Sequence, residues 1–349
     1  MENSIIDTIG CDLGDKTSIL CILHPDGEKE RHKVRTTRAA IRKFFGERPP
    51  AHVILEVGTH SRWVNELLTE LGHRVTVANP RKTQLISMSD SKSDTHDADL
   101  LARLGRVDVM LLHPIQHRSR ACQADLAIAK SRDALVACRT QLVNHVRGTV
   151  KSMGERLSTC TAESFARRTL EELPVELQPA LLPTYQAIEA LDAQIKELDR
   201  TIVQTAKKYP EIDLLMQPSG VGVLTAFVYL LTLEDKSRFT KSRNAGAFLG
   251  LRPRRSQSGD GDPQLRITKA GDPFLRRLLV NSANYILGPF GQDCDLRRWG
   301  LRLAERGGKN ARKRAKVAVA RKLAVLLHRL WVTGEVYQPI GYRQERRAA

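Results

Sequence analysis

The sequence lacks any stretch of about 18 uninterrupted apolar residues, the length that a membrane-spanning helix needs, so we expect no membrane span. Its start, MENSIIDTIG, has no basic segment followed by an apolar run, and we expect no signal peptide. The six cysteines include no C-x-x-C pair, which argues against a zinc site or a disulfide framework. The cysteine pattern predicts reduced, mostly buried thiols in a cytosol.

Acidic residues are scarce relative to basic ones. The chain has 39 Asp and Glu against 56 Lys and Arg, which gives a formal net charge of +17 and a pI near 9.9. Such an excess predicts a polyanionic partner, nucleic acid above all. Charge alone does not separate ribosomal, nucleoid-associated and enzymatic roles. The 349 residues give room for more than one domain.

Residues 1–108 carry alternating strand and helix patterns and are predicted to form one domain. The runs IIDTIGCDLG and KTSILCIL, with a third strand after the Asp-Gly turn in HPDGE, predict a three-stranded antiparallel meander. The near-continuous apolar runs AHVILEVG and HRVTVANP are typical of buried parallel strands. With the helical stretches between and after them, the order is β-β-β-α-β-α-β-α. This order predicts a mixed sheet with helices on its faces.

Residues 109–210 lose the strand signal and are predicted to be helical. Leu191, Ile195, Leu198 and Ile202 recur at heptad-like spacing, which fits either an intramolecular helical hairpin or a dimerising coiled coil. Two heptads are too few to decide between them. The prolines at 174, 179 and 183 predict a break between the helices.

Residues 211–340 are predicted to form a third, mainly α-helical domain. Gly220 and Gly222 open a helix, either as a simple tight turn or as a helix-hairpin-helix-like turn that aims N–H groups at a phosphate. A Ser/Gly/Arg-rich loop follows. Residues 297–329 then hold twelve Lys or Arg against one acid. A solvated basic face would explain this, but so dense an excess favours contact with phosphates.

Four acids carry the candidate chemistry. Asp12 lies on the first predicted strand and Glu56 on the fourth, both among apolar neighbours, where a carboxylate needs solvent, a base or a metal. Asp94 and Asp97 are three residues apart and therefore share one face of a later helix, although Asp is also common at helix starts.

An RNase H-like sheet would bring these acids together, because its first and fourth strands are adjacent and a later helix packs across their ends. Four carboxylates at one point suit Mg²⁺ or Mn²⁺, and two such ions clamp the attacking and leaving oxygens of a phosphodiester displacement. We therefore favour a metal site over helix capping. Asp15, in the turn after the first strand, and Asp99, rotated off the helix face, are left out.

Seven segments in order carry a family resemblance: IGCDLG, ILEVGTH, KSDTHDADLLA, PSGVGVLTA, AGAFLGLRPRRSQSG, ITKAGDPFLRRLL and GGKNARKRAKVAVARKLA. With them the chain resembles the IS110 family of DEDD insertion-sequence transposases, which are guided by a bridge RNA. The resemblance implies an RNase H-like, RuvC-like α/β domain holding Asp12, Glu56, Asp94 and Asp97, then a coiled coil used to form a homodimer or homotetramer. A C-terminal transposase domain with a nucleophilic serine would follow.

By position, the resemblance makes Ser258 the nucleophile, with Ser256 as a rival two residues away; an ordinary loop serine is the alternative for both. The sequence departs from the family in Leu-Glu-Val-Gly, where Glu-Ala or Glu-Pro is commoner, and in the acids Asp260 and Asp262 of the serine loop. The residues expected to contact nucleic acid are basic and flank the serine or lie in the terminal helix: Arg252, Arg254, Arg255, Arg266, Lys269, Arg312, Lys313, Arg314 and Lys316.

Other functions compete with this interpretation. IGCDLGDKTSILCILHPDGE also resembles the first phosphate loop of actin-like sugar kinases, but the rest of the chain supplies neither a second phosphate loop nor a Gly-rich adenosine segment. A non-enzymatic nucleic-acid-binding protein is disfavoured, because four convergent acids would repel the polyanion unless they bind metal. A RuvC-like junction-resolving nuclease is the nearest rival, because it needs only the first domain. It leaves the C-terminal region with Ser258 unexplained.

Overall fold

The computed structural model describes residues 6–79, 94–257, 261, 265–308 and 310–341, and for Asp94 the backbone alone. The chain divides into two compact units, Met1–His117 and Arg118–Ala349. Within the described ranges, no helix combines the length and the apolar character needed to cross a bilayer.

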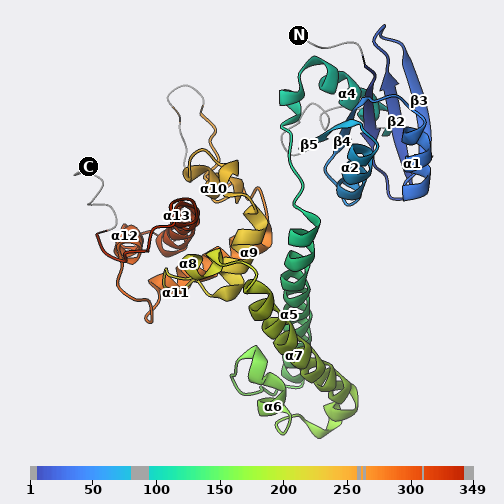
Figure 1. Cartoon of the computed structure of the whole chain (residues 1–349). Helices are drawn as coiled ribbons and strands as arrows, with labels where there is room; N and C mark the ends of the chain where they lie inside the picture. Colours follow the sequence, from blue (N-terminus) through green and yellow to red (C-terminus); the bar gives the residue numbers. More distant parts are fainter. Residues whose placement is uncertain (1–5, 80–93, 258–260, 262–264, 309, 342–349) are drawn as a thin grey trace. The chain divides into compact units, whose positions relative to one another are not determined.

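The first unit is a five-stranded mixed sheet with helices on both faces (Figure 1). The sheet order is β3-β2-β1-β4-β5. β1 pairs antiparallel with β2 and β2 with β3, whereas β1–β4 and β4–β5 are parallel, which confirms the predicted meander and mixed sheet. The elements are β1 (Thr8–Asp12), β2 (Thr17–Leu23), β3 (Lys29–Arg35), α1 (Arg38–Gly46), β4 (His52–Glu56), α2 (Ser61–Glu70), β5 (Arg74–Ala78), α4 (Asp94–Val107) and η1 (Val109–Leu112).

Side chains along the strands point alternately to the two faces of the sheet, and different helices cover the two faces. Ile9 and Cys11 of β1 point into a core shared with Ile41 and Phe45 of α1 and Leu67 of α2. The residues between them in β1 face the opposite side, where α4 packs. The two faces therefore have different partners, and Asp12 belongs to the α4 side.

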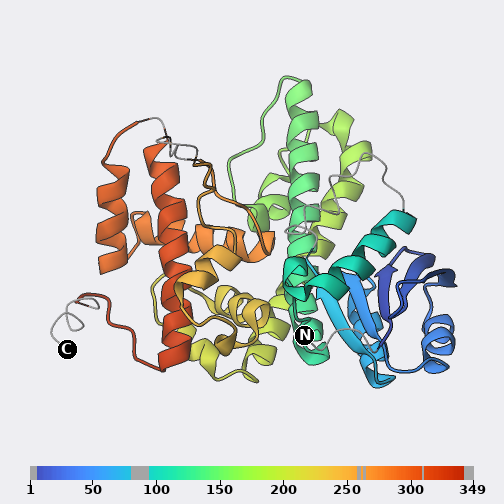
Figure 2. The same cartoon turned by 90° about the horizontal axis from the view of Figure 1, so that it is seen from above.

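The second unit is mainly helical, and its first part is a long hairpin of α5 and α7 with α6 near its tip (Figure 1). In the last part of this unit, α12 lies beside α13, the red helix of Figure 2. The elements are α5 (Arg120–Ser152), η2 (Ala162–Ser164), α6 (Phe165–Thr169), η3 (Val175–Leu177), α7 (Gln178–Ala206), α8 (Glu211–Leu215), α9 (Val223–Leu233), η4 (Lys236–Arg238), α10 (Arg243–Phe248), α11 (Pro273–Leu287), α12 (Asp295–Ala304) and α13 (Ala311–Thr333).

The hairpin is intramolecular, one of the two arrangements that the heptad pattern allows. Ile195 and Ile202 of α7 are buried, while Leu191 and Leu198 are half-buried beside them. The predicted break precedes α7, where Pro174 begins the short turn Val175–Leu177 and Pro179 lies in the first turn of the helix, but the prediction is wrong for Pro183, which lies within the helix. A proline is tolerated in the first turn, where its missing N–H would have had no intrahelical partner.

A buried arginine fixes the pairing of α5 with α7. The side chain of Arg139 is 5% exposed. Its guanidinium donates hydrogen bonds to Asp192 Oδ1 at 2.6 Å and to Glu163 Oε1 at 2.9 Å. One heptad away, Arg132 pairs with Asp199 in a more exposed position. Ion pairs so placed within an apolar seam specify which residues face each other.

We expect Arg139→Met to lower the free energy of unfolding by about 3 kcal/mol, because it leaves the carboxylate of Asp192 uncompensated in a largely buried position. Urea denaturation followed by circular dichroism measures the effect. The matched control is the double variant Arg139→Met with Asp192→Leu, which should recover most of the loss because no buried charge remains. Equal losses in the single and double variants would contradict this role of the pair.

Candidate active site

Asp12 and Glu56 end two neighbouring parallel strands. Cys11 pairs with Leu55 in the β1–β4 register, so the next residues along, Asp12 and Glu56, lie side by side at the carboxyl edge of the sheet. Directly opposed residues of paired strands project to the same face. Both are partly buried. The adjacency of strands one and four is therefore confirmed, and it brings these two carboxylates together.

Close packing of α4 against β1 sets where its first turn lies. A Cβ atom on Gly10 would come within 2.0 Å of the Ala98 carbonyl oxygen and 2.6 Å of the Ala102 nitrogen, so only glycine allows this approach. Near the other end of the helix, Arg106 donates hydrogen bonds to the carbonyl oxygens of Leu23 and His24, beside the start of β1. The helix thus runs against the direction of β1, and its first turn points toward Asp12.

Asp97 lies in that first turn and has an unsatisfied oxygen. Its Oδ1 is buried and has no hydrogen-bond partner among the described residues. An orphaned buried carboxylate oxygen is costly unless a cation or donor reaches it, and it suits a divalent ion. Among the side chains that the structure describes, no three acids, histidines or cysteines are close enough to hold an ion. The described carboxylates of Asp12, Glu56 and Asp97 therefore do not form a three-ligand site by themselves, and the side chain of Asp94 lies outside the described residues.

Asp99 has a different task in the same helix. Its carboxylate accepts hydrogen bonds from Arg31 at 2.6 Å and from Lys29 at 3.3 Å, both on β3. The Arg31 guanidinium in particular holds the pKa of Asp99 far below its usual range. This carboxylate therefore fastens α4 to the sheet.

The sequence interpretation missed one histidine at the carboxyl edge of the sheet. His60, at the start of α2, has its Nε2 3.5 Å from Asp15 Oδ1, where the loops that follow β4 and β1 meet. Its Nδ1 accepts a hydrogen bond from Trp63 Nε1 at 3.0 Å, which orients the ring. Its position four residues after Glu56, just past the end of a parallel strand, is the signal that could have identified it.

The serine loop has an ordered base. The Arg254 N–H donates to the Arg266 carbonyl, and the Thr268 N–H donates to the Arg252 carbonyl, both at 2.9 Å. The five basic residues predicted to flank the serine are all exposed: Arg252, Arg254, Arg255, Arg266 and Lys269. Ser256 is also exposed, whereas Ser258 lies outside the described residues.

Arg276 of α11 anchors the ends of this loop. It donates hydrogen bonds to the carbonyl oxygens of Leu249 at 3.0 Å and Ala270 at 2.7 Å, one on each side of the loop. Asp272 caps α11 by accepting from the N–H groups of Phe274 and Leu275. The loop is thus presented from a rigid helical base.

The basic helix α13 separates its charges from its apolar face. Arg312, Lys313 and Arg314 are exposed and Lys316 is half-buried, while Ala315 and later apolar residues are buried against neighbouring helices. The exposed charges form one cationic surface that suits a phosphate backbone.

Two family profiles match the chain, one over the carboxylates of the sheet and one over the Gly220–Gly222 turn and the serine loop. Residues 9–154 match the DEDD transposases of the IS110 type, and residues 212–289 match the family described as transposase IS116/IS110/IS902. A "Probable family 20 transposase" of Pseudomonas aeruginosa is 30% identical over 313 residues, 86% of this chain and 90% of that protein.

The chain belongs to the IS110 family of transposases.

Other members are similarly related. The transposase for insertion sequence element IS1111A of Coxiella burnetii is 30% identical over 73% of each chain. The transposase for IS1328 of Yersinia enterocolitica is 28% identical over 80% of this chain and 83% of its own. The first family match includes all four candidate acids, and the second includes Gly220, Gly222 and Ser258. The basic helix α13 lies outside both matched ranges.

Proposed function

We propose that this IS110-family protein cuts and rejoins DNA strands to move an insertion sequence, and that its first unit is an RNase H-like, RuvC-like catalytic domain. The observation that carries the proposal is the pairing of Asp12 and Glu56 at the carboxyl edge of the sheet, toward which the first turn of α4 points. Two adjacent carboxylates repel unless a cation or proton joins them.

Asp12, Glu56, Asp94 and Asp97 would hold Mg²⁺ or Mn²⁺. The oxygen-only donor set and the unsatisfied buried oxygen of Asp97 fit a hard divalent cation. Bound divalent ions supply Lewis-acid stabilisation of the phosphate charge in a phosphodiester displacement. The protein's own part would be to present two carboxylates from adjacent strand ends and two from the first turn of α4.

Ser258 would act as the nucleophile. Its Oγ forms a bond to the backbone phosphorus as one phosphorus–oxygen bond of the DNA breaks, and the departing sugar hydroxyl ends with the proton that the serine loses. The exposed arginines at the base of the loop would balance the charge on the phosphate during this exchange. The phosphoserine ester conserves the energy of the cleaved bond, so a second strand can be joined without further input.

DNA and a bridge RNA are the proposed partners of a homodimer or homotetramer. Arg312, Lys313, Arg314 and Lys316 would bind backbone phosphates irrespective of sequence. A RuvC-like nuclease remains the second candidate, since the carboxylate pair alone would support strand hydrolysis.

A reconstituted reaction tests the proposal. The protein is incubated with a plasmid carrying the insertion sequence, RNA transcribed from the non-coding flank, and Mg²⁺, and new strand junctions are amplified and sequenced. We expect junctions that depend on Mg²⁺ and disappear with a chelator, because the carboxylates cannot stabilise the phosphate charge alone. Nicked plasmid without any junction would favour the nuclease instead.

A further inference from the structure

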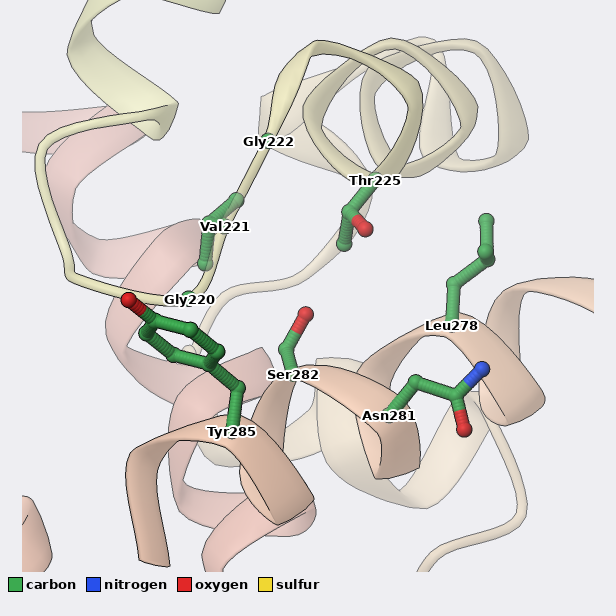
Figure 3. Close-up of a pocket in the computed structure, with 8 residues that line it drawn as sticks. All are labelled: Gly220, Val221, Gly222, Thr225, Leu278, Asn281, Ser282 and Tyr285. Carbon is green, nitrogen blue, oxygen red and sulfur yellow. The ribbon is translucent and has the colours of Figure 1, made fainter. Parts of the chain in front are cut away.

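A hollow of about 460 Å³ lies between the start of α9 and one face of α11, within the second unit (Figure 3). Its walls are the turn Gly220–Gly222, Thr225 of α9 and the α11 residues Leu278, Asn281, Ser282 and Tyr285. No carboxylate and no basic side chain is among these lining residues.

Two buried hydroxyls face this hollow without a protein partner. Ser282 is 4% exposed and Thr225 is 8% exposed. Figure 3 shows Ser282 pointing from α11 toward α9, and Thr225 pointing from α9 back toward α11. Neither hydroxyl has a hydrogen-bond partner among the residues that the structure describes. Because both side chains line the hollow, their hydroxyls can reach a molecule that enters it, and a ligand oxygen can accept hydrogen bonds from them.

The first turn of α9 offers further donors. Gly222 caps this 11-residue helix without a side-chain hydrogen bond, so the first N–H groups lack an intramolecular acceptor from that residue. The backbone does not need glycine there, because its φ is −92° and an added Cβ would meet nothing within 4 Å. A Ser, Asp or Asn would cap the helix and stabilise it. The chain forgoes that stability and leaves the N–H groups open.

Gly220, unlike Gly222, has a backbone conformation and surroundings that require glycine. Its φ is +86°, and an added Cβ would come within 3.0 Å of Tyr285 and 3.1 Å of the Ser282 carbonyl oxygen. Gly220 is therefore required by the turn, whereas Gly222 is the position that keeps the mouth of the hollow free. Tyr285, 46% exposed, adds an aromatic ring beside it on which a base can stack.

We propose that this hollow binds one backbone phosphate of a nucleic-acid strand, held by the α9 N–H groups and the hydroxyls of Thr225 and Ser282, with the adjoining base on Tyr285. A helix start with free N–H groups and neutral hydroxyl donors selects an anion, and a single phosphate fits this donor set. This proposal rests on the proposed function only for the identification of the ligand as nucleic acid.

Methyl NMR of the full-length protein tests the site, with the dinucleotides pTpT and pUpU as probes. We expect saturable shifts of the Thr225, Val221 and Leu278 methyl signals at concentrations up to about 10 mM. Shifts with both probes assign the site to the shared backbone, and shifts with one alone assign it to DNA or to RNA. Absence of shifts with both overturns the proposal. The titration involves no strand cleavage, so its result is independent of whether the protein recombines DNA.

Variants of one position separate ligand binding from folding. Gly222→Asp should raise Tm by about 2 °C through self-capping and abolish the shifts, because its carboxylate occupies the N–H groups and repels phosphate. The matched control Gly222→Ala should retain them, since it adds only a methyl group in open space. Ser282→Ala should weaken binding by about tenfold without lowering Tm. A lowered Tm with unchanged affinity would make the hydroxyl structural and overturn its assignment.

Discussion

Asp12→Asn is expected to reduce metal-dependent strand cleavage by about 1,000-fold or more. The site depends on carboxylates to hold divalent cations, whose charge stabilisation of a phosphoryl transition state amounts to several kcal/mol, and each 1.4 kcal/mol is a factor of ten in rate. The variant should remain folded and bind DNA. Without metal its Tm should stay the same or rise, because repulsion between Asp12 and Glu56 falls.

A labelled DNA substrate on a denaturing gel, with Mg²⁺ varied, measures this loss. The matched control is Asp15→Asn, which removes an acid three residues along the chain whose side chain is 91% exposed. It should cleave at the normal rate. Full cleavage by a double variant, Asp12→Asn with Asp94→Asn, would refute the metal assignment.

Ser258→Ala should eliminate the covalent protein–DNA adduct and lower recombination by about 10⁴-fold or more, as expected for loss of a nucleophile that has no substitute. Ser256→Ala is the matched control and should still form the adduct. The measurement is a labelled DNA species that migrates with the protein on a denaturing gel when strand exchange is blocked. An adduct that survives Ser258→Ala and vanishes with Ser256→Ala would transfer the role to Ser256.

A mixture of the inactive Asp12→Asn and Ser258→Ala chains tests whether one reaction centre uses residues of two protomers. If the carboxylates and the serine of one reaction centre come from different protomers, Asp12→Asn mixed with Ser258→Ala should regain partial activity. Complete inactivity of the mixture would restrict each reaction to residues of a single chain.

The sheet was predictable because its signals are local. Apolar runs and the Asp-Gly turn are short-range patterns, and they gave the strands and the antiparallel meander. The adjacency of the first and fourth strands, which places Asp12 beside Glu56, came from the expected RNase H-like sheet. The role of Asp99 was not predictable, because its partners Lys29 and Arg31 lie on a distant strand. Helix periodicity separated it correctly from Asp97 but gave no information about what it binds.

The second unit shows where such patterns fail. Pro183 suggested a break, yet it lies within α7, where packing against α5 outweighs its local preference. Gly220 and Gly222 were recognised as a turn, but Ser282 and Tyr285 complete the hollow from a helix some sixty residues further along the chain. Contacts of that range depend on tertiary packing, which periodicity does not record.

The paired charges of the α5–α7 hairpin constrain its length, because shortening one helix alone shifts the charges out of register. α5 has 33 residues, which corresponds to a rod of about 50 Å at 1.5 Å per residue. Deleting one heptad from α5 between its start and Arg132 would move Arg139 about 10 Å, to a place opposite Asp199, and would leave the largely buried Asp192 without its arginine. Deleting matched heptads from α5 before Arg132 and from α7 after Asp199 would keep every pair. Natural variation in the reach of this hairpin should therefore occur in both helices at once, and an engineer can shorten it only by the same rule.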